Sequence, residues 1–173
     1  MKASQRRDQI VAILKEKPSP ISATKLAKEL GVSRQVIVGD IALLRASNID
    51  IMATHRGYLL VNNLPKPKTQ YIKKIACQHS EEQVAKELDI IVSGGGQVLD
   101  VEIEHPLYGI LTATLNIATK DDIKYFTQQV KEHQGALLSH LTHGIHNHTI
   151  SCPSKAVCEK ILEILKKENI LLT

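Results

Sequence analysis

A helix-turn-helix pattern near the N-terminus constrains the fold of this chain more than any other sequence feature. Ser22 is placed to begin a helix as its N-cap, and Gly31 ends that helix where the backbone needs a left-handed residue. Val32 fills the turn, and Ser33 begins another helix that runs to about Ala46. In such a pair the second helix enters the major groove of DNA by its N-terminal end.

A preceding helix and a following hairpin complete this pattern. Apolar residues at helical spacing precede Pro18, which ends the first helix of the chain. After the recognition helix we predict two short strands, at about 49–54 and 58–61, with a turn at 55–57 between them. Residues 1–61 are therefore predicted to form a winged helix-turn-helix domain.

The residue types in the recognition helix and the wing suit contact with DNA. Ser33, Arg34 and Gln35 lie at the start of the recognition helix. Arginine pairs well with guanine, glutamine pairs well with adenine, and the backbone amides of a first helical turn can hold a phosphate. Arg45 and Arg56 are expected near the duplex backbone. We predict that these residues contact a double-stranded DNA operator; the alternative is a three-helix fold used for protein contacts.

The charge distribution supports the DNA interpretation. Residues 1–61 hold ten Lys/Arg and five Asp/Glu, a net charge of +5, whereas the remaining residues hold twelve and thirteen, a net charge of −1. The positive excess therefore lies where a polyanion would bind. Gly39 departs from the pattern, because a glycine inside a helix costs about 1 kcal/mol relative to alanine. It either allows close approach to DNA or to another helix, or it has no role.

A change of pattern after residue 61 indicates a second domain. Residues 62–70 are polar and contain prolines, which is typical of a linker. From residue 71 to 173, strands and helices alternate in the order β-α-β-β-α-β-α, and a capping box of Ser80 with Gln83 is predicted to begin the first of these helices. The predicted fold class is α+β, with a split βαβ (βαββαβ plus one helix) sandwich after the winged helix. Such a sandwich leaves one sheet face free of helices, which suits ligand binding or dimerisation.

Histidines crowd into the last third of the chain. His146 and His148 are two residues apart in a predicted strand and therefore point to one face, where two imidazoles can bind one metal ion. The alternative is a pair of structural histidines. His79, which ends the first strand of this domain, and His105 are among the residues that could supply further ligands.

Four stretches carry a resemblance to a known family: GVSRQVIVGDIALLRA, HSEEQVAKEL, HPLYG and GIHNHTISCP. Together they span nearly the whole chain, which resembles the niacin-responsive transcriptional repressors. These proteins join a winged helix to a three-histidine (3H) domain. Gly39 departs from the family pattern, which weakens the assignment of base contacts near the middle of the recognition helix.

The resemblance implies repression of niacin uptake or salvage genes, with nicotinic acid as co-repressor. It also implies that the 3H domain, residues 71–173, holds a divalent transition metal ion. The implied ligands are His79, Glu87, His146 and His148. Imidazole and carboxylate ligands suit Zn, Ni or Fe. His105 and Tyr108 are candidates for contact with the organic ligand near this site.

Two other functions stay open at this point. One is a metal-responsive regulator without an organic effector, and the other is a metal-dependent hydrolase fused to a DNA reader. The histidine cluster lacks the paired Asp or Ser of a hydrolase motif, so we expect no enzyme activity. A homodimer is expected, because two-fold operators require two-fold proteins.

Composition indicates a cytoplasmic protein without a membrane partner. No stretch approaches the roughly 20 apolar residues of a membrane span, and the N-terminus lacks the apolar core of a signal peptide. The three cysteines are odd in number and show no CxxC spacing, which argues against a disulfide framework.

Overall fold

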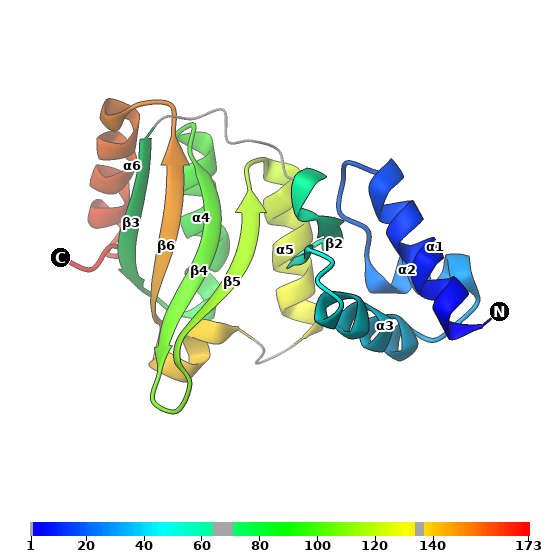
Figure 1. Ribbon diagram of the computed structural model, residues 1–173. Helices are drawn as coiled ribbons and strands as arrows, with labels where there is room; N and C mark the ends of the chain where they lie inside the picture. The colour runs from blue at the N-terminus through cyan, green and yellow to red at the C-terminus, as the bar shows by residue number, and fades with distance from the viewer. Residues whose placement is uncertain (1, 64–70, 134–136) are drawn as a thin grey trace. The chain divides into compact units, whose positions relative to one another are not determined.

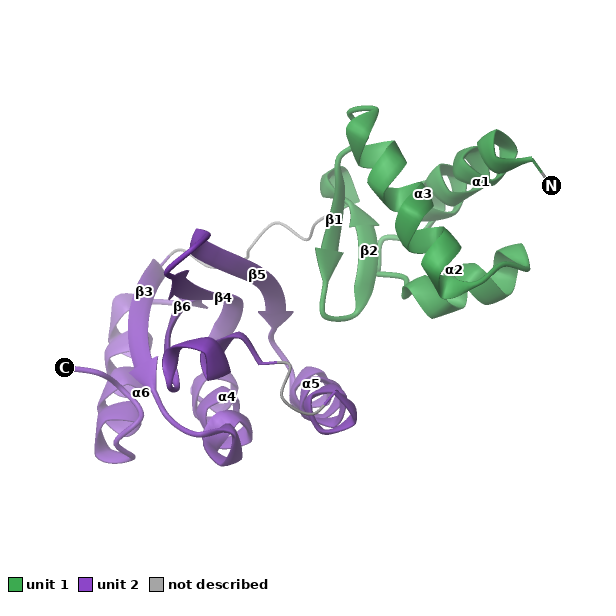
Figure 2. Cartoon of the chain, turned by 90° about the horizontal axis from the view of Figure 1, so that it is seen from below, with its two compact units in different colours: residues 1–66 green, residues 67–173 purple. Residues whose placement is uncertain are grey.

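The structure is a computed structural model that describes residues 2–63, 71–133 and 137–173. The chain divides into two compact units, residues 1–66 and 67–173 (Figure 2). Most of the expected linker, residues 64–70, lies outside the described residues. Within the described part of the chain, no helix is both long and apolar enough to cross a membrane.

The first unit has three helices followed by a two-stranded wing (Figure 1). Its elements are α1 (Ala3–Glu16), α2 (Ala23–Leu30), α3 (Arg34–Ala46), β1 (Ile51–Thr54), β2 (Gly57–Leu60) and the 3-10 turn η1 (Val61–Asn63). The hydroxyls of Ser22 and Ser33 accept hydrogen bonds from the backbone N–H groups of Lys25 (3.1 Å) and Val36 (3.3 Å). Gly31 has a φ of +65°, which ends α2. The predicted winged helix-turn-helix is confirmed.

A buried ion pair joins α1 to the recognition helix α3. Asp40 of α3 is only 3% exposed, among apolar residues of the core such as Ile37 and Ile41. The Nε atom of Arg6 donates to its carboxylate at 2.5 Å, and Nη1 of Arg7 lies 3.6 Å from it. The arginines thereby compensate a buried charge and fix how α3 lies against α1.

The wing lies against the residue that precedes α2. Tyr58 of β2 and Ile21 exchange two backbone hydrogen bonds, of 2.9 and 2.8 Å. Gly57 has a φ of +132°, and a Cβ atom there would lie 2.2 Å from the carbonyl oxygen of Ile21. Only glycine permits this close approach of two backbones.

The second unit has the predicted order of strands and helices. Its elements are β3 (Tyr71–Gln78), η2 (Glu81–Gln83), α4 (Val84–Ser93), β4 (Gln97–His105), β5 (Gly109–Ile117), α5 (Lys120–Glu132), η3 (Leu138–Thr142), β6 (Ile145–Cys152) and α6 (Lys155–Lys167). The four strands form one antiparallel sheet in the order β3-β6-β4-β5. Strands β3 and β4 are therefore parallel to each other with β6 between them, and the predicted split βαβ sandwich is confirmed.

The helices α4, α5 and α6 cover one face of this sheet (Figure 2). Alternation along β6 points His146, His148 and Ile150 toward that face, and Ile150 is fully buried in its apolar core. The two histidines therefore lie under the helices. The candidate metal ligands on β6 therefore do not lie on the helix-free face, and the use of that face for ligand binding or dimerisation stays a prediction.

The predicted capping box at Ser80 is wrong. Ser80 precedes the 3-10 turn η2, its hydroxyl makes no capping hydrogen bond, and α4 begins only at Val84. The carbonyl of Ser80 instead accepts from the backbone N–H of Gln83 at 3.1 Å, as a 3-10 turn requires.

Candidate functional site

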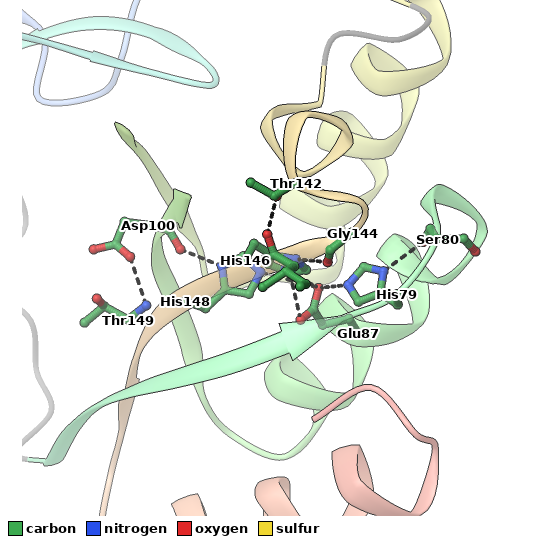
Figure 3. A network of polar contacts seen from close by, with 10 residues as sticks. His79, Ser80, Glu87, Asp100, Thr142, Gly144, His146, His148 and Thr149 are labelled. Atoms are coloured by element: carbon green, nitrogen blue, oxygen red, sulfur yellow. Dashed lines mark hydrogen bonds and ion pairs between the residues drawn. The ribbon is translucent and has the colours of Figure 1, made fainter. Parts of the chain in front are cut away.

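Four side chains converge between β6, the end of β3 and the first turn of α4 (Figure 3). The Nε2 atoms of His79 and His148 lie 2.6 Å and 3.4 Å from Oε2 of Glu87. The Nε2 atom of His146 lies 3.3 Å from Oε1 and 3.4 Å from Oε2 of the same carboxylate. None of the four residues is more than 8% exposed, so water solvates their polar atoms very little. The structure thus brings together the residues that the resemblance implied as metal ligands.

Each of the three imidazoles is also held at its other ring nitrogen by a backbone carbonyl. The carbonyls belong to Ser80 for His79 (2.8 Å), Gly144 for His146 (2.9 Å) and Asp100 for His148 (2.6 Å). A carbonyl oxygen only accepts, so each Nδ1 must donate, and a neutral ring then carries its lone pair on Nε2. Metal-binding histidines are typically oriented by such a hydrogen bond.

The convergence leaves acceptors facing acceptors. Three Nε2 lone pairs and the carboxylate of Glu87 point at one another in a buried place, and four acceptors cannot satisfy each other. A positive charge must lie among them, supplied either by protons on the imidazoles or by a metal ion. The chemistry of this donor set therefore fits a divalent transition metal.

The electrostatics of the site without a metal agree with protons in this role. Burial alone would lower the pKa of His79 and of His148, but hydrogen bonds to Glu87 and its charge outweigh burial, and both pKa values are raised. Burial would likewise raise the pKa of Glu87, yet hydrogen bonds from the three histidines hold it well below its usual range. Without a metal, the carboxylate of Glu87 thus favours the protonated, positively charged form of the imidazoles around it.

Cys77 belongs to the same cluster and was not predicted from the sequence as part of it. It lies directly opposite His146 in the pairing of β3 with β6 and is fully buried. Its sulfur, a carboxylate oxygen of Glu87 and a ring nitrogen of His146 all lie within 4.8 Å of one another. Burial, the charge of Glu87 and a hydrogen bond to Glu87 all raise the pKa of the Cys77 thiol. The signal for it was its position two residues before His79, on the inward face of the strand.

A narrow cavity of about 40 Å³ opens beside the histidines. His79, Glu87, His146 and His148 form one wall of it. The opposite side is mostly apolar, formed by Val101, Leu115, Phe126, Leu137 and Leu138. A small molecule bound here would contact the imidazoles on one side and apolar side chains on the other.

His105 and Tyr108 are not among the described residues that line this cavity. They lie at the tip of the β4–β5 hairpin, where Nδ1 of His105 accepts from the backbone N–H groups of Leu107 (3.2 Å) and Tyr108 (3.3 Å). The two rings pack together with centroids 5.0 Å apart, and Tyr108 is 70% exposed. The tight turn that ends at Gly109 uses these residues for its own geometry, and their role as ligand contacts stays a prediction.

The recognition helix presents its predicted contact residues to solvent. Ser33, Arg34 and Gln35 are exposed, although the hydroxyl of Ser33 is already used to cap the helix. Gly39 lies one turn after Gln35 and is also exposed. Among the described residues nothing lies within 4 Å of a Cβ atom built at Gly39, so the fold of this unit does not require glycine there.

Arg45 and Arg56 differ in how the unit uses them. The Nε atom of Arg45 donates to the carbonyl of Ile51 (2.8 Å), and its guanidinium lies 5.7 Å from the ring centroid of Tyr58. Arg45 therefore ties the end of α3 to the wing. Arg56 lies in the wing turn, where its backbone N–H donates to Oγ1 of Thr54 at 3.2 Å.

Comparison with known proteins adds independent information on both units. Residues 72–173 match the family described as 3H domain, and residues 6–59 match a family described as HTH domain. The chain is 40% identical over 169 residues to "Transcription repressor NadR" of Bacillus subtilis (strain 168), an alignment that covers 98% of this chain and 94% of that protein. It is 36% identical over 168 residues to "Probable transcription repressor NiaR" of Thermotoga maritima, with 97% and 94% covered. The names of both relatives describe a transcription repressor, the second as a probable one, rather than an enzyme.

Proposed function

Because this chain belongs to the 3H-domain family and is a DNA-binding transcription repressor, we propose that it represses genes of niacin uptake or salvage when nicotinic acid is bound. In this proposal the 3H unit holds a divalent metal ion together with the effector. The helix-turn-helix unit binds the operator.

The convergence of acceptors on Glu87 is the observation that carries the metal part of the proposal. A divalent ion held by His79, Glu87, His146 and His148 would satisfy three lone pairs and a carboxylate at once. The bound ion would supply a Lewis-acidic position that attracts an anion or a ring nitrogen. Zn, Ni and Fe all suit these ligands, and metal analysis of the purified chain identifies which one is bound.

The charge of such a site favours an anionic effector. A divalent ion with one carboxylate leaves a net charge of +1 in a place shielded from solvent, and a buried charge is costly unless it is balanced. Nicotinate offers one negative charge and an aromatic ring, and the ring suits the apolar wall formed by Leu115, Phe126 and Leu137. At about 40 Å³ the cavity holds a few water molecules, so entry of the ring requires lining side chains to move.

DNA binding is proposed to use two copies of the chain. A single recognition helix offers Arg34 and Gln35 for bases and Arg56 for the backbone, which is a small contact surface. Two copies related by a two-fold axis would read both halves of a palindromic operator.

A gel shift on DNA from upstream of the chain's own gene tests this function. Four samples contain the metal-depleted chain with no addition, with metal, with nicotinic acid, and with both. We expect retardation at the lowest protein concentration only when both are present. Nicotinamide is the matched control, because it keeps the pyridine ring but lacks the carboxylate, and it should not replace nicotinic acid.

Other outcomes assign a different function. Retardation that needs metal but not nicotinic acid would identify a metal sensor. Equal effects of nicotinamide and nicotinic acid would show that the charge of the effector is irrelevant. Unchanged nicotinate affinity after chelation, measured by calorimetry, would refute contact between effector and metal.

Metal affinity is expected to fall as the pH is lowered, and the fall should begin above about pH 6.5, the ordinary histidine pKa. Protons compete with the metal for the Nε2 atoms, and the pKa values of His79 and His148 are raised, so protons hold these rings at a higher pH than usual. Calorimetric titration at several pH values, in buffers of different ionisation enthalpy, should show proton release on metal binding. An affinity that is flat between about pH 6 and 8 would contradict this.

The metal-free chain should depend on pH in the opposite direction. A raised histidine pKa contributes stability that is fully present below about pH 6.5 and is lost as the pH rises through the folded-state pKa. Metal should therefore stabilise the chain most at the alkaline end, where the protons it replaces are absent. Melting temperatures with and without metal across this range measure the difference.

A further inference from the structure

Cys77 lies beside the cluster of histidines but is not one of the residues that the family resemblance assigns to the metal. It is fully buried on β3, directly opposite His146 on β6. Its sulfur lies within 4.8 Å of a carboxylate oxygen of Glu87 and of a ring nitrogen of His146. Strand pairing and burial therefore hold the sulfur at a fixed place next to the residue on which the whole site converges.

The two oxygens of Glu87 are used unequally by the histidines. Oε2 lies within 3.4 Å of all three Nε2 atoms, whereas Oε1 has a contact within hydrogen-bond distance only to His146, at 3.3 Å, among the described histidines. A carboxylate that binds a metal through one oxygen commonly has its other oxygen held by a donor from the protein. A thiol is a weak donor, but here it is buried and has a charged acceptor.

We propose that Cys77 is a positioning residue for the metal site: its thiol holds the carboxylate of Glu87 toward His79, His146 and His148, and its sulfur does not bind the metal. This inference rests on the proposed metal site. A neutral thiol leaves the net charge of the loaded site at +1, which an anionic effector can balance. A thiolate ligand would instead neutralise the site and remove that attraction.

Two substitutions separate the donor from the volume of the side chain. Cys77→Ser keeps a hydrogen-bond donor, and Cys77→Val keeps a side chain of similar size without one. Metal affinity of the full chain, measured by competition with a chelator, should fall by about 10–100-fold in Cys77→Val, the usual effect of losing a group that orients a ligand. Cys77→Ser should stay close to the wild type. Melting of the metal-free variants checks that both are folded.

X-ray absorption of the zinc-loaded wild-type chain tests the role of the sulfur directly. We expect only nitrogen and oxygen neighbours, at about 2.0–2.2 Å from the ion. A sulfur neighbour at about 2.3 Å would overturn the proposal in favour of a thiolate ligand. Unchanged affinity in Cys77→Val, or equal losses in both folded variants, would also overturn it. Failure of the wild-type chain to bind metal would refute the proposed metal site itself, which is a different result.

Discussion

Glu87→Gln is expected to lower the affinity of the chain for divalent metal by at least about 100-fold, beyond the 10–100-fold effect of losing a residue that only orients a ligand. Glutamine keeps the size and shape of the side chain but removes the negative charge that His79, His146 and His148 share. Without that charge, no carboxylate would balance a divalent ion in this buried place, and only neutral imidazoles would bind it. Competition with a chelator, followed by metal analysis, measures the loss.

Glu102→Gln is a matched control for this substitution. Glu102 is also a carboxylate of the 3H unit, but it pairs with Lys74 at 2.7 Å, and the side chain of Lys74 is about half exposed. Ion pairs of this kind contribute little, so metal affinity should not change. In gel shifts, Glu87→Gln should lose the response to metal and nicotinic acid while keeping weak binding to unrelated DNA. A Glu87→Gln chain that binds metal like the wild type would refute the proposed site.

The helix-turn-helix unit could be predicted closely because its signals are local. A serine N-cap, a left-handed glycine and the next serine N-cap lie within twelve residues, and each acts on backbone groups of its own neighbours. Ser22, Gly31 and Ser33 accordingly do in the structure what the sequence indicates. The contacts of Arg45 with Ile51 and Tyr58 could not be predicted in this way, because they depend on where the wing packs against α3.

The candidate metal site could be predicted only in part from the residues themselves. His146 and His148 share a face because the side chains of a strand alternate, which needs no knowledge of the fold. The contact of His79 with Glu87 depends on the 3-10 turn η2, which lies between β3 and α4 and reverses the chain. Sequence spacing does not reveal that turn, and the signal at Ser80 favoured a longer helix. The family resemblance supplied this half of the site.

The strand order explains the remaining omissions. Nothing local indicates that β6, the last strand, lies between β3 and β4, and only this order places Cys77 opposite His146. The position of Cys77 two residues before His79 indicates only that it points inward, and an inward-facing cysteine in a strand usually serves as a small apolar core residue. His105 and Tyr108 were predicted near the site from their residue types; they lie at the end of β4 and in the turn that follows it, and neither lines the cavity beside the histidines.

Gly144→Ala is expected to destabilise the 3H unit by about 3 kcal/mol or more, combining a left-handed backbone with an overpacked contact. Gly144 has a φ of +86°, and a Cβ atom there would lie 2.4 Å from the carbonyl oxygen of His79. That neighbour is backbone and cannot move aside without moving His79. The carbonyl of Gly144 also orients the ring of His146, so metal affinity should fall together with stability.

Gly109→Ala separates backbone strain from this close contact. Gly109 also has a left-handed backbone, with a φ of +72°, but nothing among the described residues lies within 4 Å of a Cβ atom there. Alanine at this position should therefore cost only the conformational strain, about 1–2 kcal/mol, and should leave metal affinity unchanged. Urea unfolding of the two full-length variants, combined with chelator competition, measures both quantities.

Equal losses of stability with unchanged metal affinity in both variants would mean that the contact between Gly144 and His79 does not hold the site together. A loss of metal affinity confined to Gly144→Ala would instead show that the close approach of the two backbone segments positions the histidines next to Glu87. This contact involves backbone atoms only, so no other side chain could replace it.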